Sequence, residues 1–250
     1  RDLTFVRRLS KQISFTKLEK DNVAISSQGI IRGSRQKRHE AILGRLILEP
    51  AQFPTGTFIH LSAKELPVNN DPFTHRLTDL TAFDLPQLVI KLSWLKELGR
   101  FQAAIVKSGQ KEQEEDKKGI ICSGSYVSVH VAEQSFPVLE AAWLSYNSKL
   151  CTYYLLLSSG RFAFERPEIK PKDLLRIPIP EPQPGLLQGI NTIGDIDQRI
   201  RQAFSLKDSE WVLIDDLFDY TLPDLKGDIS SPGRQRTHRK DNKENIEPEL

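Results

Sequence analysis

The chain has 250 residues, 38% of them hydrophobic and 27% charged, and a formal net charge of +2. This length can bury a sizeable core in one or two domains, and the small net charge does not by itself indicate a polyanionic partner. No run of about 18 apolar residues exists, which excludes a transmembrane helix, and nothing at Arg1 resembles a signal sequence. We therefore expect a cytoplasmic protein without membrane association.

Cysteine and methionine usage add two expectations. Cys122 and Cys151 are the only cysteines, too few for a disulfide scaffold or a four-cysteine zinc site, so both are interpreted as buried thiols. The chain contains no methionine. Because natural chains begin with methionine, the sequence indicates a fragment that lacks its N-terminal part.

The first 60 residues mix a helical piece around Phe5 and Leu9 with short extended pieces at 46–48 and 58–60. Four cations fall within the seven residues 32–38, with glycines at 29 and 33 and no acid among them. Such a loop can place guanidinium groups and backbone amides against phosphates, and a solvated surface loop is an equally open alternative. These cations are Arg32, Arg35, Lys37 and Arg38.

Residues 83–131 are predicted to supply the strands of a sheet. The β-rich runs are 87–92, 101–106, 120–121 and 126–131. In the last run Tyr126, Ser128 and His130 alternate with valines, the period of a half-buried strand, so we expect one wet face. The charged stretch 109–118 has no apolar anchor and is predicted to be a solvated, mobile connection.

A long helix is predicted from Pro137, suited to a first turn, to residue 158, with Gly160 just past its end. Its apolar residues recur every three or four positions and form one stripe that requires a partner surface. They are Leu139, Trp143, Tyr146, Leu150, Tyr153 and Leu157. The proline-rich run 178–185 is predicted to be an extended, stiff spacer.

Two further helices are predicted near the C-terminus. One carries the stripe Ile190 to Phe204, and the other follows Asp208, a plausible N-cap. The acid pairs at 195 and 197 and at 215 and 216 are interpreted as exposed helix faces. The chain thus divides into a mixed segment 1–60, an α+β core 61–185, C-terminal helices 186–226 and a disordered tail 227–250.

The predicted fold class is α+β, with a small mixed or antiparallel sheet, supporting helices and a C-terminal helical pair. No catalytic residue or metal site is predicted. The five histidines are scattered without an i, i+4 pair, and no nucleophile sits in a recognisable turn. The string Asn70-Asp71-Pro72-Phe73 lacks a second proline and is interpreted as an ordinary turn.

Several segments resemble the DNA target-recognition domain of N-6 adenine DNA methyltransferases of restriction-modification systems, and related domains of restriction specificity subunits. The clearest are Asn147-Ser148-Lys149-Leu150 with Tyr153 and Tyr154, then residues 158–162, then residues 174–180. The resemblance extends more weakly to residues 83–91, to residues 100–104, to Ile196-Asp197 and to Asp215-Asp216.

This resemblance implies a module that binds double-stranded DNA in the major groove and reads base edges. Adenine methylation needs a glycine-rich cofactor loop and an (Asn/Asp)-Pro-Pro-(Tyr/Phe) turn, and neither is present. The fragment should therefore hold no cofactor, and S-adenosyl-L-methionine would belong to a methyltransferase domain missing from its N-terminal side. Whether the chain itself is an enzyme stays open.

Nine residues are candidate DNA contacts: Arg32, Arg35, Lys37, Arg38, Lys107, Ser123, Ser125, Arg161 and Arg166. Arg161 and Arg166 flank Phe162-Ala163-Phe164, where an exposed arginine could bind guanine. Alternatively, the phenylalanines pack into the core and the arginines pair with Glu165 or Glu168. A second functional hypothesis is a docking scaffold of a restriction-modification complex, in which the C-terminal helices and the Trp143 stripe bind a partner protein.

Overall fold

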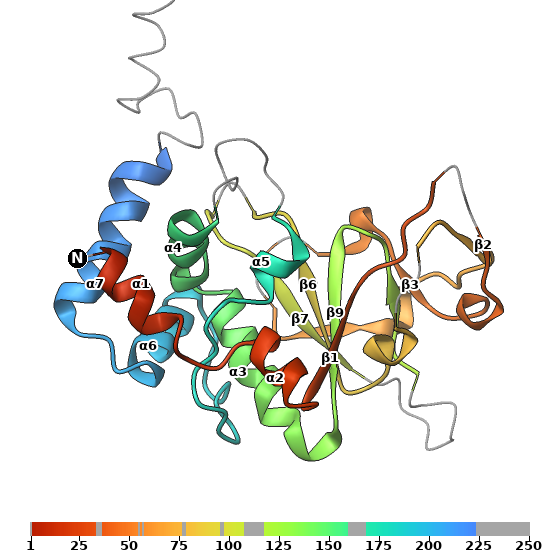
Figure 1. Cartoon of the computed structure of the whole chain (residues 1–250), viewed down its shortest axis with the longest axis horizontal. Coiled ribbons are helices and arrows are strands. Elements are labelled where there is room, and N and C mark those ends of the chain that lie inside the picture. The colour runs from red at the N-terminus through yellow and green to blue at the C-terminus, as the bar shows by residue number, and fades with distance from the viewer. Residues whose placement is uncertain are drawn as a thin grey trace, which may run out of the picture.

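The structure is a computed structural model, and it describes residues 2–33, 37–54, 56, 58–76, 79–95, 98–107, 118–159 and 169–223. A five-stranded sheet lies in the middle of the molecule, with helices towards one end and a small β lobe towards the other (Figure 1). This arrangement confirms the predicted α+β class and the pair of C-terminal helices.

The sheet is mixed and has the order β1 (Ala24–Gln28), β9 (Tyr126–Val131), β6 (Gln87–Lys91), β7 (Ala103–Lys107), β4 (His60–Ser62). All neighbours are antiparallel except β7 and β4, which are parallel. The three central strands agree with the predicted runs 87–92, 101–106 and 126–131. Edge strand β1 was not predicted, because its sequence AISSQ has little apolar alternation to indicate a strand.

The helices are α1 (Asp2–Leu9), α2 (Phe15–Lys20), α3 (Phe136–Tyr146), α4 (Lys149–Ser158), α5 (Pro171–Leu174), α6 (Ile193–Ala203) and α7 (Asp208–Asp216). A π-helical turn η7 (Leu217–Thr221) continues α7. Thr192 and Asp195 form a capping box that begins α6. The residue that precedes α7 is Lys207, so Asp208 is the first helical residue and not the N-cap that we predicted.

The predicted helix 137–158 is two helices. The chain leaves helical geometry at Ser148, whose φ and ψ are −91° and 162°, and α4 begins at the next residue. The helix α3 is also buried on all sides and is not amphipathic, since Ala141, Ala142 and Ser145 are as inaccessible as Trp143. Only Leu157 of the predicted stripe is exposed, at 38%. The partner surface of the stripe is therefore the protein's own core.

Both faces of the sheet are covered. Residues such as Leu88, Ile90 and Val129 face the helices, while Val89, Ala104 and Tyr126 belong to a second core with the lobe residues. The expectation of a wet face on strand β9 was wrong. A 3-10 turn, η4 (Leu80–Phe83), packs against that strand, and the fully buried Ser128 donates its Oγ proton to the Ala82 carbonyl. The polar alternation marks internal hydrogen bonding, not solvent.

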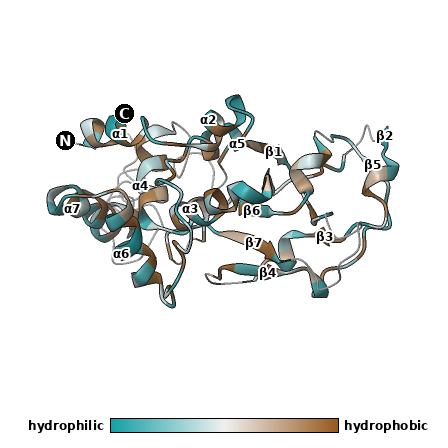
Figure 2. Cartoon of the chain, turned by 90° about the horizontal axis from the view of Figure 1, so that it is seen from below, coloured by the Kyte–Doolittle hydropathy of each residue, from teal (hydrophilic) through white to brown (hydrophobic). Residues whose placement is uncertain are grey.

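The β lobe contains two short pairs. One joins β3 (Ile47–Leu48) and β8 (Ile121–Cys122) in parallel, and the other joins β2 (Lys37–Arg38) and β5 (Phe73–Thr74) antiparallel. The pair β2 and β5 lies at the end of the molecule farthest from α1, α6 and α7 (Figure 2). The remaining 3-10 turns are η1 (Glu40–Ile42), η2 (Pro50–Gln52), η3 (Ala63–Glu65) and η6 (Glu133–Ser135).

The proline-rich run after α5 is extended at its start, but it is not a free spacer. Ile179 donates its N–H to the Ile13 carbonyl, and Ser145 donates its hydroxyl to the Pro178 carbonyl at 2.7 Å. Ile177 and Ile179 are buried in the helical core. The predicted mobile stretch 109–118, apart from its last residue, and the predicted tail 227–250 lie outside the described residues. Among the helices that the structure does describe, none is long and apolar enough to span a membrane.

Candidate nucleic-acid interface

The basic segment predicted from the sequence is carried by a two-stranded ribbon. Ile31 pairs antiparallel with Arg76, and Lys37 and Arg38 pair antiparallel with Thr74 and Phe73. The described ends of the basic segment are therefore both held by residues 73–76, while residues 34–36 lie outside the described residues. We call residues 31–33, 37–38 and 73–76 the ribbon.

Arg32, which follows the paired residue Ile31, is held by three polar residues. Its Nη2 donates to Asn69 Oδ1 at 3.1 Å, and its guanidinium lies 3.8 Å from both the Glu49 and the Asp71 carboxylates. Asn69 is 2% exposed and donates to the Ile42 and Asp71 carbonyls, so its amide is fixed. No acid lies within residues 32–38, but the fold brings two carboxylates from elsewhere in the chain to this arginine.

The next cations lie exposed on β2. Arg38 forms an ion pair with the exposed Glu40, while Lys37 has no ion pair among the described residues. Opposite Arg38, the side chain of Phe73 is 40% exposed. An exposed ion pair is weak, so Arg38 can exchange Glu40 for another acceptor. Arg35 lies outside the described residues.

Arg76 is a candidate that the sequence reasoning missed. It is exposed, pairs with Ile31 through backbone hydrogen bonds, and so lies on the ribbon beside the anchor of Arg32. It has no ion pair among the residues that the structure describes. No local motif indicates it, because only its antiparallel pairing with Ile31, more than forty residues earlier in the chain, places it here. The ribbon thus gathers cations from both of its strands.

Ser123 and Ser125 belong to the turn between β8 and β9, at the base of the ribbon. Gly29 is pressed against this turn: a Cβ atom there would lie 2.0 Å from the Ser123 carbonyl oxygen. Gln28 Nε2 also donates to the Gly124 carbonyl at 2.7 Å. The Ser123 hydroxyl is buried, with no hydrogen-bond partner among the described residues, so as it stands this side chain does not face solvent.

Lys107 lies elsewhere. It pairs with Ser62 of edge strand β4, at the end of the sheet opposite to Gly29 and the 123–125 turn. Burial and the charge of Lys107 both lower the pKa of the nearby His60 imidazole. The structure therefore does not bring Lys107 together with the ribbon. Arg161 and Arg166, with their possible partners Glu165 and Glu168, are outside the described residues, although Ile169 just after them donates its N–H to the Leu92 carbonyl at 3.0 Å.

The acids of the C-terminal helices are structural. Asp197 is 9% exposed and binds the guanidinium of the buried Arg100 with both carboxylate oxygens, so the expectation of an exposed face was wrong for this residue. It also accepts the backbone N–H of Lys149 at 3.1 Å, while Lys149 Nζ binds Asp215 at 2.7 Å. Asp195 is half-buried and serves in the capping box. These pairs connect α6 and α7 to α4 and to the sheet.

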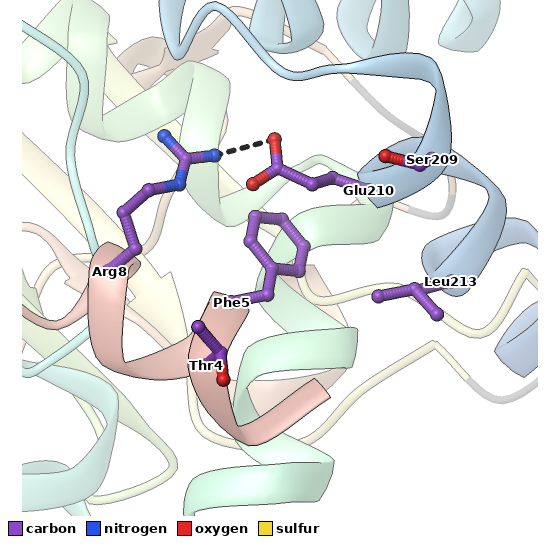
Figure 3. Close-up of a pocket in the computed structure, with 6 residues that line it drawn as sticks. All are labelled: Thr4, Phe5, Arg8, Ser209, Glu210 and Leu213. Carbon is purple, nitrogen blue, oxygen red and sulfur yellow. Dashed lines mark hydrogen bonds and ion pairs between the residues drawn. The ribbon is translucent and has the colours of Figure 1, made fainter. Parts of the chain in front are cut away.

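A second surface lies at the opposite end, between α1 and α7. Six residues line a cavity of about 570 Å³ there, and Arg8 crosses it to pair with Glu210 at 2.8 Å (Figure 3). They are Thr4, Phe5, Arg8, Ser209, Glu210 and Leu213. Nearby apolar side chains face outward: Leu3 is 73% exposed, Val212 52% and Tyr220 72%. We call this surface the α1–α7 groove.

Reactive side chains are sparse in the described ranges. No group of three or more His, Cys, Asp or Glu residues could hold a metal ion there. Cys122 and Cys151 are buried as expected, and burial raises the pKa of both thiols, which disfavours the nucleophilic thiolate. At the Asn70-to-Phe73 string, Asp71 Oδ1 accepts the Phe73 N–H at 2.9 Å, the hydrogen bond of an ordinary Asx turn.

No protein-family model matches the chain, and no curated protein matches it.

Proposed function

We propose that this chain is the sequence-specific DNA-recognition module of an adenine-specific DNA methyltransferase of a restriction-modification system, acting in the cytoplasm. In this proposal the module grips double-stranded DNA, and a methyltransferase domain outside the chain binds S-adenosyl-L-methionine and methylates adenine at N6. The proposal starts from the resemblance of residues 143–180. It assigns the chain itself no catalytic step.

The observation that supports it most is the convergence of cations on the ribbon. Arg32, Lys37 and Arg38 come from one strand and Arg76 from the other, and all four are exposed. Lys37 and Arg38 are successive residues of β2 and therefore point to opposite faces, and exposed cations on both faces of a narrow ribbon can contact phosphates. Asn69 and the 123–125 turn support this ribbon from beneath, which fixes its orientation.

The rest of the fold suits the role of a rigid holder. The buried pair Arg100–Asp197 and the ion pair Lys149–Asp215 tie the C-terminal helices to the sheet that carries the ribbon. Recognition surfaces work best when rigid elements position the contacting side chains. A scaffold of this kind can orient a duplex relative to a second domain.

The test is the salt dependence of binding. The 250-residue chain is titrated with a fluorescent 20-base-pair duplex at several salt concentrations, and log K is plotted against log salt. Each phosphate contact contributes a slope of about −0.9, so two to four contacts give a total of about −2 to −4. Arg7→Ala on α1, at the opposite end, is the matched control and should leave the slope unchanged. Absence of binding at low salt, or a slope near zero, would contradict the proposal.

A second candidate function, a docking scaffold, is supported by the α1–α7 groove. The Trp143 stripe no longer favours it, because Trp143 is 1% exposed. Val212 of α7 and Tyr220 of η7, in contrast, are exposed, and Tyr220 lines a second cavity that shares Leu213 with the first. Exposed apolar surface of this kind is typical of docking sites. The occupant we assign is the methyltransferase domain implied by the resemblance. Val212→Glu together with Tyr220→Glu should abolish that association in sedimentation experiments with the two proteins, without changing the salt slope for DNA.

A further inference from the structure

The ribbon has two faces that differ in what covers them. Thr74 is fully buried, and its hydroxyl is bonded to the Ile31 and Arg76 carbonyls, so its side chain is turned towards the protein, although its pair Lys37 on the same face is exposed. Directly opposite residues of an antiparallel pair share a face, and successive residues alternate. Arg38 and Phe73 are therefore together on the outward face, where Phe73 is 40% exposed.

From this placement we propose that the ribbon enters the major groove of DNA, with Phe73 packed against thymine methyl groups and Arg38 at the neighbouring base edge. The inference rests on the proposed DNA-recognition function and names the element and the base chemistry that would carry it. A two-stranded ribbon is one of the two elements that the major groove admits, and the thymine methyl is the apolar group that it displays.

An aromatic ring is suited to this contact in a way that the cations are not. Charged side chains grip phosphates of any sequence, while an apolar ring distinguishes a thymine from a cytosine or a purine. Arg38 provides the complementary contact, since a guanidinium can donate to both acceptors of guanine. Its partner Glu40 is solvent-exposed, so the exchange of acceptors costs little.

The outward face is also held in place before DNA binds. The Asp71 carboxylate accepts the Phe73 N–H, and the His39 N–H donates to the Pro72 carbonyl at 2.8 Å, so Phe73 lies on a braced turn. Asn69 fixes Arg32 beside the other pairing point, Ile31–Arg76. A braced ribbon loses little conformational freedom on binding, which favours sequence-specific contact.

The test combines a protein substitution with a base substitution. A duplex enriched from a random pool by the 250-residue chain is made with thymine or with deoxyuridine, which lacks the methyl group. We expect Phe73→Ala to weaken binding of the thymine duplex about tenfold and to leave binding of the deoxyuridine duplex nearly unchanged. Val68→Ala, which removes another exposed apolar side chain of the lobe, is the control and should act equally on both duplexes.

Photocrosslinking gives an independent readout. A duplex with 5-iodouracil in place of thymine carries its reactive iodine in the major groove and should crosslink to the peptide that contains Phe73. Crosslinks on other peptides, or equal effects of Phe73→Ala on both duplexes while salt-dependent binding persists, would overturn the ribbon inference and leave DNA recognition intact. No salt-dependent binding to any duplex would overturn both.

Discussion

Two polar regions of the molecule differ in their exposure to solvent. One is the ribbon, and the other is the site where Arg100, Asn147 and Asp197 meet, which we call the helical junction. At the junction, Arg100 is 5% exposed, Asn147 1% and Asp197 9%, whereas on the ribbon Phe73 is 40% exposed and the Arg32 side chain 44%. The junction polar groups bond one another, and the ribbon groups face solvent. Buried polar residues of this kind specify a fold, and exposed ones are available to a ligand.

Most segments that resemble target-recognition domains lie in the buried region and not on the ribbon. The runs at 100–104 and 147–150 and the helix at Ile196-Asp197 meet at the junction, where Arg100 binds both Asp197 and the Asn147 carbonyl. The run at 174–180 packs against α3 through the Tyr146 hydroxyl and the Leu174 carbonyl. The segments that carry the resemblance thus belong mostly to the scaffold. The proposed DNA contacts lie outside these segments, in the β lobe.

The largest expected effect comes from breaking the junction with Asp197→Ala. This change leaves the Arg100 guanidinium buried without its carboxylate and removes the acceptor of the Lys149 N–H. We expect a loss of about 3–5 kcal/mol in the free energy of unfolding, measured in urea. The salt slope of DNA binding by the folded fraction should stay the same. A loss below about 1 kcal/mol would show that the pair is not the centre of the junction.

The next effect is expected at Asn147, which joins α3 to β7. Its side chain both donates to the Ala103 carbonyl and accepts the Ala103 N–H, so Asn147→Ala leaves two buried backbone groups without partners. We expect a loss of about 2–3 kcal/mol in unfolding free energy. Asn70→Ala, an exposed asparagine in the lobe, should change it by less than about 0.5 kcal/mol. Equal losses of unfolding free energy in the two variants would contradict the distinction between the buried junction and the exposed lobe.

Gly29 marks the border between the sheet and the ribbon. A Cβ atom at this position would overlap the Ser123 carbonyl, so Gly29→Ala should force the chain away from the turn and cost about 1–3 kcal/mol. Gly33→Ala is the matched control, because its Cβ would come no closer than 3.5 Å to the His75 side chain, an ordinary contact distance. Thermal unfolding of the two variants distinguishes them, and a wild-type melting curve for Gly29→Ala would refute the close approach.

On the ribbon itself the expected effect on stability is small and the effect on binding is specific. Arg76→Ala should change the unfolding free energy by less than about 0.5 kcal/mol, because the side chain is exposed. It should make the salt slope less negative by about 0.9 if the guanidinium contacts a phosphate. Lys37→Ala should behave in the same way. A large loss of stability in either variant would show that these cations stabilise the fold and are not free to bind DNA.

The smallest effect concerns pH. The pKa of His60 is lowered in the folded protein, first by burial and then by Lys107, so the unfolded chain binds a proton more readily. Stability therefore falls as pH drops below the ordinary histidine value of about 6.5. His60→Gln should flatten this part of the curve of unfolding free energy against pH. An unchanged curve between about pH 7 and pH 5 would show that another group controls it.

Sequence reasoning identified the central strands because their apolar periodicity is local. It placed the break at Ser148 inside a single helix, because the local apolar spacing continues across it. Asn147, just before the break, is bonded to Ala103 of the distant strand β7, a contact that local spacing does not reveal. It found Arg32, Lys37 and Arg38 as neighbours in the chain but could not find Arg76. It also took the alternation in β9 for a wet face, because η4 covers that face from elsewhere in the sequence.

What the sequence by itself determined is the α+β class, the main strands, the C-terminal helices and the presence of a basic segment, since each follows from composition or short-range spacing. Only the tertiary structure decided which cations gather and which acids approach them. It paired Ile31, Lys37 and Arg38 with residues 73–76 and left Lys107 at the other end of the sheet. The physical reason is that side-chain burial and pairing depend on contacts between segments far apart in the chain, which local patterns do not encode.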